Sequence, residues 1–148
     1  MDGFAELNKV LVNLFNEILA VEMQAMQTEK FKDITNNDMH VIDAIGIGEQ
    51  QNMSTVAAKL SVTVGSLTIA INGLVKKGYV HRERSKKDRR VVHIALSEKG
   101  IEAYRYHEHF HQSMVEEIVD EMDAQELDVL IRALKKVDGW IAKRKEEN

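Results

Sequence analysis

The chain has 148 residues, the length of one domain, and combines 44% hydrophobic with 30% charged residues at a formal net charge of −4. It contains no cysteine, which excludes disulfides, thiolate metal sites and thiol-based redox sensing. No apolar run approaches the roughly 20 residues of a membrane span, and the first residues lack the basic start and apolar run of a signal peptide. We therefore expect a cytoplasmic protein without a membrane partner.

The first third of the chain predicts two helices separated by a polar segment. Apolar residues recur at spacings of three and four from Phe4 onward, which predicts a long amphipathic helix that ends at about Met26. Residues 36–38, Asn-Asn-Asp, offer a cap for a second helix over residues 39–47, and two glycines would end it.

A pair of short helices comes next. Ser54 can cap a helix over residues 55–60, and Thr63 can cap a second one over residues 64–77. Only a two-residue turn separates them, and Gly78 is suited to a left-handed C-cap. This spacing predicts a helix-turn-helix.

The hydrophobic period then changes from 3.6 to 2. Residues 79–84 and 91–96 both have the pattern of strands, and the six polar residues 85–90 join them as a hairpin. Ser97 can cap a further long helix. Asp123 and the Glu three residues later have capping-box spacing, which predicts the start of the last helix.

The order of elements predicts a mostly α fold with a small β-hairpin wing, that is, a winged helix-turn-helix domain with long dimerisation helices. We expect one domain over residues 1–148, with the DNA-binding part at about 36–97. The dimerisation helices would cover about 3–27 and 98–146. Their apolar faces exceed what a small core can cover, so we expect a homodimer.

The charge distribution points to a nucleic acid. Eight basic and two acidic residues lie between Lys76 and Arg90, so a basic segment stands on an acidic body, and a polyanion senses this local field. A solvated charged hairpin is the alternative interpretation.

A recognition helix needs short polar residues at its leading end, so that its backbone can approach base edges in the major groove. Residues 63–72 meet this need, and an arginine at the hairpin tip suits a narrow minor groove. Asp88 would pair with a neighbouring arginine and hold its guanidinium in place. We expect a double-stranded, palindromic, A·T-rich operator, and the predicted DNA-binding residues are Thr63, Gly65, Ser66, Thr68, Asn72, Lys76, Lys77, Arg82, Arg84, Ser85, Lys86, Lys87, Asp88, Arg89 and Arg90.

Three segments carry a family resemblance: LVKKGYV (74–80), DRRVV (88–92) and LSEKG (96–100). Together they resemble the MarR family of winged-helix regulators, with Ser97 in place of the usual Thr. Ile69 departs from the family, because most members have an arginine there.

Within the family, FKDI (31–34), MHVID (39–43) and VTVG (62–65) look like the fatty-acid-synthesis repressors, the FabT-like subgroup. This likeness implies a repressor of the type II fatty-acid-synthesis genes, with acyl-acyl carrier protein as co-repressor. Basic residues outside the DNA face, such as Lys30, Lys32 and Arg105, would receive the acidic carrier. Five methionines (Met23, Met26, Met39, Met114 and Met122) either fill the core or line a deformable tunnel for the acyl chain.

The histidines offer two further interpretations. His107 to His111 spells His-Glu-x-x-His, the zinc-protease motif. A hydrolase would also need a third ligand, an open coordination position and a substrate cleft, and a helix in a small dimer scaffold offers no evident cleft, so we expect no enzyme. Zinc-sensing members of the MarR family use a Glu from the first helix, a His from the second and two from the fifth. Glu22, His40, His107 and His111 match that set, although histidines retained for packing are the alternative.

Three functions therefore remain open. The chain is a repressor of fatty-acid synthesis, a zinc-responsive regulator of the same fold, or a protein-interaction module whose basic hairpin binds an acidic partner. The first two require no cofactor, and they differ in the effector, an acyl chain on acyl carrier protein or zinc.

Overall fold

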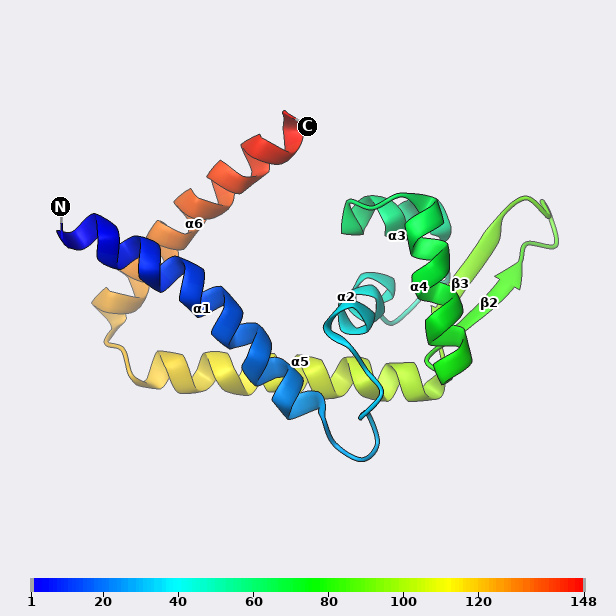
Figure 1. Cartoon of the computed structure of the whole chain (residues 1–148), viewed down its shortest axis with the longest axis horizontal. Helices are drawn as coiled ribbons and strands as arrows, with labels where there is room; N and C mark the ends of the chain where they lie inside the picture. Colours follow the sequence, from blue (N-terminus) through cyan, green and yellow to red (C-terminus); the bar gives the residue numbers. More distant parts are fainter. Residues whose placement is uncertain (1, 148) are drawn as a thin grey trace. The chain divides into compact units, whose positions relative to one another are not determined.

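The computed structural model describes residues 2–147, which form six helices and a small antiparallel sheet (Figure 1). This is the mostly α fold with a hairpin wing that the pattern predicts. The elements are α1 (Asp2–Met26), α2 (Asn36–Ile45), β1 (Gln51–Asn52), α3 (Met53–Leu60), α4 (Val64–Lys77), β2 (Val80–Arg84), β3 (Val92–Leu96), α5 (Glu98–Asp120) and α6 (Ala124–Glu146).

Four predicted helix boundaries are confirmed by their capping contacts. The Thr63 side chain accepts from the amide of Ser66 at the start of α4, and Ser97 Oγ accepts from the amide of Gly100 at the start of α5. Asp123 forms a capping box at the start of α6. Gly78 ends α4 at φ 89°, in the left-handed region that favours glycine. These signals depend on residues within one turn of each other, so the sequence carries them directly.

Three other boundaries were predicted wrongly. Helix α2 is capped by Thr35, whose side chain forms a capping box with Asp38, and it ends at Ile45 rather than residue 47. Helix α3 is capped by Asn52 rather than Ser54. Asn52 also belongs to β1, a two-residue strand absent from the prediction, which pairs with β3. A strand this short has no period to detect.

The sheet has the order β1-β3-β2, and both pairs are antiparallel. Val80 pairs with Leu96 and Arg84 with Val92, so the β2–β3 hairpin keeps one register along its length. One side of the sheet meets a core built from α2, α3 and α4. The largest fully buried side chains are Tyr79, Met26, Ile42, Ile45, Leu67, Ile71, Leu74, Ile94, Val56 and Val80.

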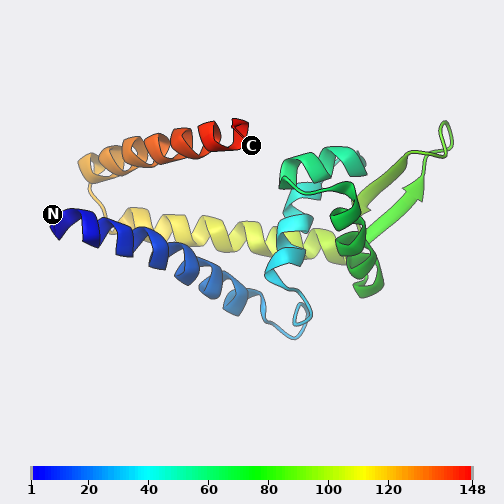
Figure 2. The same ribbon diagram turned by 45° about the horizontal axis from the view of Figure 1, so that its top comes forward.

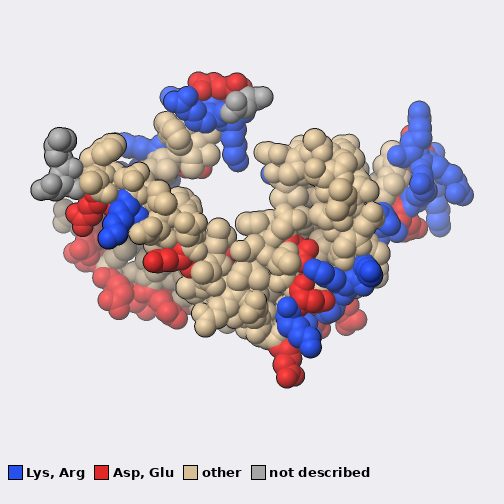
Figure 3. All heavy atoms as spheres, in the orientation of Figure 1, with Lys and Arg blue, Asp and Glu red and all other residues tan. Residues whose placement is uncertain are grey.

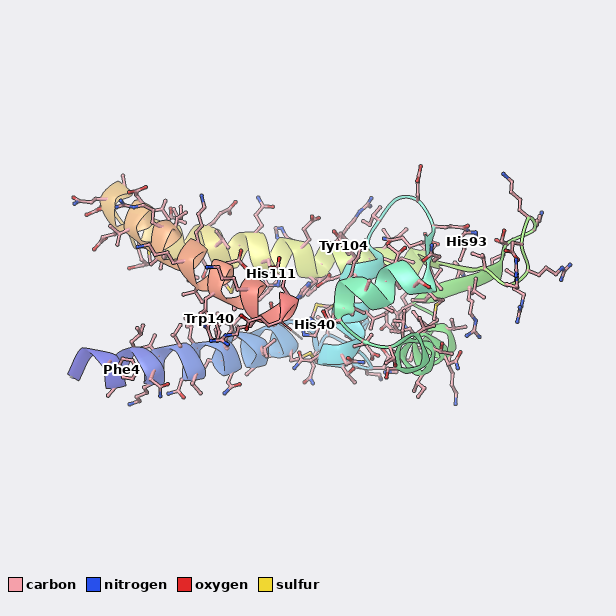
Figure 4. All side chains as sticks on the ribbon, turned by 90° about the horizontal axis from the view of Figure 1, so that it is seen from above. Phe4, His40, His93, Tyr104, His111 and Trp140 are labelled. Atoms are coloured by element: carbon pink, nitrogen blue, oxygen red, sulfur yellow. The ribbon has the colours of Figure 1, made fainter. Side chains whose placement is uncertain are left out.

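The described chain forms two compact units, residues 1–110 and 111–148, and one domain over the whole chain stays a prediction. In the first unit, α1 exposes large apolar side chains. Phe4, labelled in Figure 4, is 81% exposed and Phe15 is 59% exposed. In the second unit, α6 buries no side chain, and Trp140 is 60% exposed. Both faces are suited to contact another chain.

Among the described residues, no single helix is long and apolar enough to cross a membrane. Helices α3 and α4 together have the length and composition of a membrane span, but the pair is bent by 104°.

We predict that Gly100→Ala destabilises the fold strongly. A Cβ at Gly100 would overlap the carbonyl oxygen of Tyr79 and lie 3.2 Å from Leu96 Cβ, so either backbone or core must move. We expect a loss of about 3 kcal/mol in the free energy of unfolding, measured by urea denaturation at fixed protein concentration. Gly73→Ala is the matched control, because nothing lies within 4 Å of its Cβ position, and it should gain about 0.5–1 kcal/mol. Equal stability of the two variants would contradict this packing.

Candidate nucleic-acid interface

A cleft of about 870 Å³ opens between α3, α4 and the β2–β3 hairpin. The hairpin projects beyond α4 (Figure 2), and Lys and Arg side chains gather over it (Figure 3). Three hairpin arginines line the cleft, Arg82, Arg84 and Arg90, and α4 contributes Thr68 and Asn72. A concave surface with several guanidinium groups is suited to a polyanion.

Helix α4 divides its residues between the core and this surface. Leu67, Ile71 and Leu74 are buried, and the opposite face is exposed, including Gly65 and Asn72. The sequence predicted this division. It did not predict that the polar groups on α4 already have partners within the chain.

Those partners change the role of two predicted base contacts. Thr68 Oγ1 donates to the carbonyl of Val64 at 2.8 Å, so its hydroxyl proton is used inside the helix. Asn72 Oδ1 accepts from the guanidinium of Arg82. Asn72 therefore directs Arg82 across the cleft and keeps its amide N–H groups and one oxygen lone pair for a ligand.

The hairpin tip is held in shape by its own side chains. Asp88 binds Arg90 through two contacts, Oδ1 to Nε at 3.1 Å and Oδ2 to Nη2 at 3.2 Å, which confirms the predicted pairing. The hydrogen bonds that Arg90 donates hold the pKa of Asp88 below its ordinary value. The Arg90 side chain nevertheless stays 91% exposed.

Further contacts brace the turn. Arg84 Nη1 donates to the carbonyl of Arg89 at 2.8 Å. Ser85 Oγ accepts from the amides of Lys87 and Asp88 at 3.2 and 3.3 Å. The side chains of Lys86, Lys87 and Arg89 remain exposed, so the turn presents them to solvent on a fixed backbone.

Lys77 is placed differently from the prediction. Its ammonium lies 2.6 Å from Asp38 Oδ2 and 2.8 Å from the carbonyl of Asp33. It therefore ties the end of α4 to the first turn of α2 and to the segment before that helix, and does not line the cleft. Lys76, one residue earlier, is exposed and keeps the position expected of a phosphate contact.

Sequence reasoning missed the contribution of α3. Asn52, Met53 and Ser54 line the cleft opposite the hairpin arginines. The signal that could have revealed this contribution was position, because these residues lie at the start of the first helix of the predicted helix-turn-helix.

The predicted metal-binding residues lie outside the cleft, and two of them are neighbours. Glu22 on α1 and His107 on α5 are both buried, with Glu22 Oε1 3.6 Å from His107 Nε2. Asp43 on α2 approaches the other ring nitrogen, with Oδ2 3.1 Å from Nδ1. Burial acts to lower the pKa of His107, but the hydrogen bond and charge of Asp43, with those of Glu22, outweigh it and raise the pKa.

Of the other two predicted ligands, His111 offers a ligand atom within 4.8 Å of those of Glu22 and His107, and only His40 is placed apart. His111 follows His107 by one turn of α5. His40 is exposed and lines a different groove of about 390 Å³, together with Lys59 and Ser66. The two residues are labelled in Figure 4. The structure therefore does not bring His40 to Glu22 and His107.

Comparison with known proteins identifies the relatives of this chain. Residues 25–105 match the family model described as "Transcriptional regulator SarA/Rot". A crystal structure of FabT from Streptococcus pneumoniae in complex with DNA is 38% identical, with a TM-score of 0.90, over 95% of this chain and 98% of that one. The predicted likeness to this subgroup is confirmed.

Two further relatives support the same fold. SarZ of Staphylococcus saprophyticus is 41% identical over 68 residues, which are 46% of this chain and 47% of that protein, so the match spans about half the length of the curated relative. The MepR–DNA complex of S. aureus has a TM-score of 0.70 at 18% identity, over 90% of this chain and 96% of that one. The family model and SarZ are both described as transcriptional regulators.

We predict that Lys77→Ala lowers the free energy of unfolding by about 1.5 kcal/mol, because it removes a charged hydrogen bond to the buried Asp38. Lys76→Ala is the matched control and should change it by less than about 0.5 kcal/mol, since that side chain is exposed. Urea denaturation of both variants measures the difference. A larger loss in Lys76→Ala would contradict the assignment of these two lysines.

Proposed function

The chain belongs to the SarA/Rot family of transcriptional regulators and has the MarR-type winged-helix fold, and on this basis we propose that it represses fatty-acid-synthesis genes as a DNA-bound homodimer. The proposal implies a cytoplasmic site of action on a palindromic, A·T-rich operator. The observation that carries this proposal is the cleft, which is lined both by residues of α4 and by three arginines of the hairpin.

The geometry supports contact with both grooves of one half-site. Helix α4 would enter the major groove with its exposed face. The hairpin tip would reach the adjacent minor groove, where an A·T-rich sequence is narrow and strongly negative and favours an arginine such as Arg90. The pairing of Arg90 with Asp88 orients the guanidinium in advance, so less side-chain entropy is lost on binding. Binding of an acidic protein would not require the hairpin arginines to be aligned with α4.

The homodimer is supported by the exposed apolar faces of α1 and α6. Phe4, Leu7 and Phe15 on α1 are each more than half exposed, and so are Leu134 and Trp140 on α6. A two-fold dimer would bury these side chains and match the symmetry of a palindrome.

Acyl-acyl carrier protein as co-repressor is supported by the likeness to the fatty-acid-synthesis repressors, which extends over nearly the whole chain. Of the three basic residues expected to receive the carrier, Lys30 is paired with Glu102. Lys32 and Arg105 are exposed, so they are the stronger candidates for an acidic surface.

A zinc-responsive regulator is the second candidate, favoured by the surroundings of His107. Metal-bound histidines commonly donate their second ring N–H to a carboxylate, which fixes the ring. Asp43 occupies that position and leaves Nε2 directed toward Glu22. Glu22, His107 and His111 would hold the ion, and a bound zinc would supply charge that ties α1 to α5. His40 would have to move to complete the set.

We predict that Arg90→Ala lowers operator affinity at least tenfold at fixed salt and leaves stability unchanged, since the side chain is exposed. The operator is first selected from a random duplex library with the wild-type protein, and affinity is measured by fluorescence anisotropy. Stoichiometry in the same titration should give two chains per duplex.

Arg132→Ala is the matched control for this experiment. Arg132 is 67% exposed on α6 and pairs with Asp128, so its loss should leave operator affinity within twofold. Recovery of no duplex, or equal affinity of Arg90→Ala and the wild type, would contradict the proposed function.

We predict that long-chain acyl-acyl carrier protein tightens operator binding about 5- to 150-fold, the usual range of allosteric coupling, and that zinc does not. Gel shifts with the acylated carrier, the carrier without acyl chain, zinc and a chelator separate the two candidates. If only zinc shifts the curve and His107→Ala removes that response, the zinc-responsive function is correct and the acyl-carrier function is wrong.

A further inference from the structure

The most exposed apolar side chain of α4 is Ile69, which is 75% exposed. Gly65, Ile69, Asn72 and Lys76 follow each other at spacings of four, three and four residues, so they share one face of the helix. The core residues Leu67, Ile71 and Leu74 lie on the opposite side. Ile69 therefore stands at the centre of the face that points away from the protein.

The polar residues beside Ile69 offer limited base recognition. The hydroxyl proton of Thr68 is donated to Val64, and one of the two lone pairs on the side-chain oxygen of Asn72 accepts from Arg82. Gly65 has no side chain. At the centre of this face, the most exposed side chain is the apolar one of Ile69.

We propose that Ile69 is a specificity-determining residue that recognises the C5 methyl group of a thymine in the major groove. The thymine methyl is the apolar group on a base-pair edge in that groove, and it distinguishes T·A from the other pairs. The inference rests on the proposed function, because it requires α4 to lie in the groove. It gives the A·T preference of the operator a second source besides the hairpin tip.

The charges around α4 favour DNA over a protein as the occupant of this face. Arg82, Arg84 and Arg90 line the cleft that flanks α4, and Lys76 ends the exposed face of the helix. An apolar residue surrounded by cations is suited to a surface where phosphates surround methyl groups. The apolar faces suited to a second copy are those of α1 and α6.

The test removes the methyl groups one at a time. Each thymine in a half-site of the selected duplex is replaced by deoxyuridine, and affinity is measured for the wild type and for Ile69→Ala. Alanine at this exposed helical position preserves the fold, because its helix propensity exceeds that of isoleucine. Ile47→Ala is the matched control, an exposed isoleucine outside α4.

For the wild type and Ile47→Ala, we expect one or two thymines at which deoxyuridine weakens binding about fourfold, the effect of burying one methyl-sized group. Ile69→Ala should bind the thymine duplex about fourfold more weakly per half-site and be insensitive to deoxyuridine at those positions. Sites selected with Ile69→Ala should also lose their preference for thymine there.

Two results would overturn the inference while leaving the proposed function intact. In the first, no thymine is sensitive to deoxyuridine in the wild type. In the second, Ile69→Ala keeps the full sensitivity, which would assign the methyl contact to another residue. If no duplex is selected at all, the inference fails together with the proposed function.

Discussion

The carbonyl oxygen of Tyr79 is the point at which α4, the hairpin and α5 meet. It accepts from the amide of Ser97 at 2.9 Å, while Gly100 of α5 approaches it too closely for any side chain. The tyrosine ring is fully buried, and its hydroxyl donates to Asp33 at 2.5 Å. Burial first, and then the hydrogen bond and charge of Asp33, raise the pKa of Tyr79 far above its ordinary value. The left-handed Gly78 just before it turns the chain from helix to strand. This corner fixes where the hairpin leaves α4.

The fixed corner lets the cleft be organised before any ligand arrives. Arg82 is held by Asn72 and Arg90 by Asp88, so the positions of these guanidinium groups follow from the angle between helix and hairpin. Oriented cations lose less conformational entropy when they meet phosphates or a minor groove. Lys77 stabilises this arrangement because its ammonium group joins the last turn of α4 to Asp38 of α2. Lys77, predicted as a DNA contact, therefore has a positioning role in the structure.

The sequence carried the parts of the structure that are decided locally. Capping at Thr63, Ser97 and Asp123, the left-handed Gly78 and the pairing of Asp88 with Arg90 all join residues within a few positions, so side-chain chemistry and spacing determine them. The partner of Lys77 lies 39 residues away, and that of Asn72 is on a strand that only the tertiary fold brings close. His40 was assigned to Glu22 by resemblance, but its exposed position on α2 depends on how that helix packs. Contacts between distant segments have no signature in a single sequence.

Hydroxyl-radical footprinting of the selected operator tests most directly whether α4 and the hairpin share one half-site. With the wild-type protein, we expect two symmetric protected segments whose centres lie about one helical turn apart. Each should include minor-groove sugars beside the segment covered by α4, where the hairpin tip would lie. Arg90→Ala, at a concentration that restores occupancy, should lose this minor-groove protection and keep the rest. A single asymmetric footprint, or an unchanged pattern with Arg90→Ala, would contradict this mode of binding.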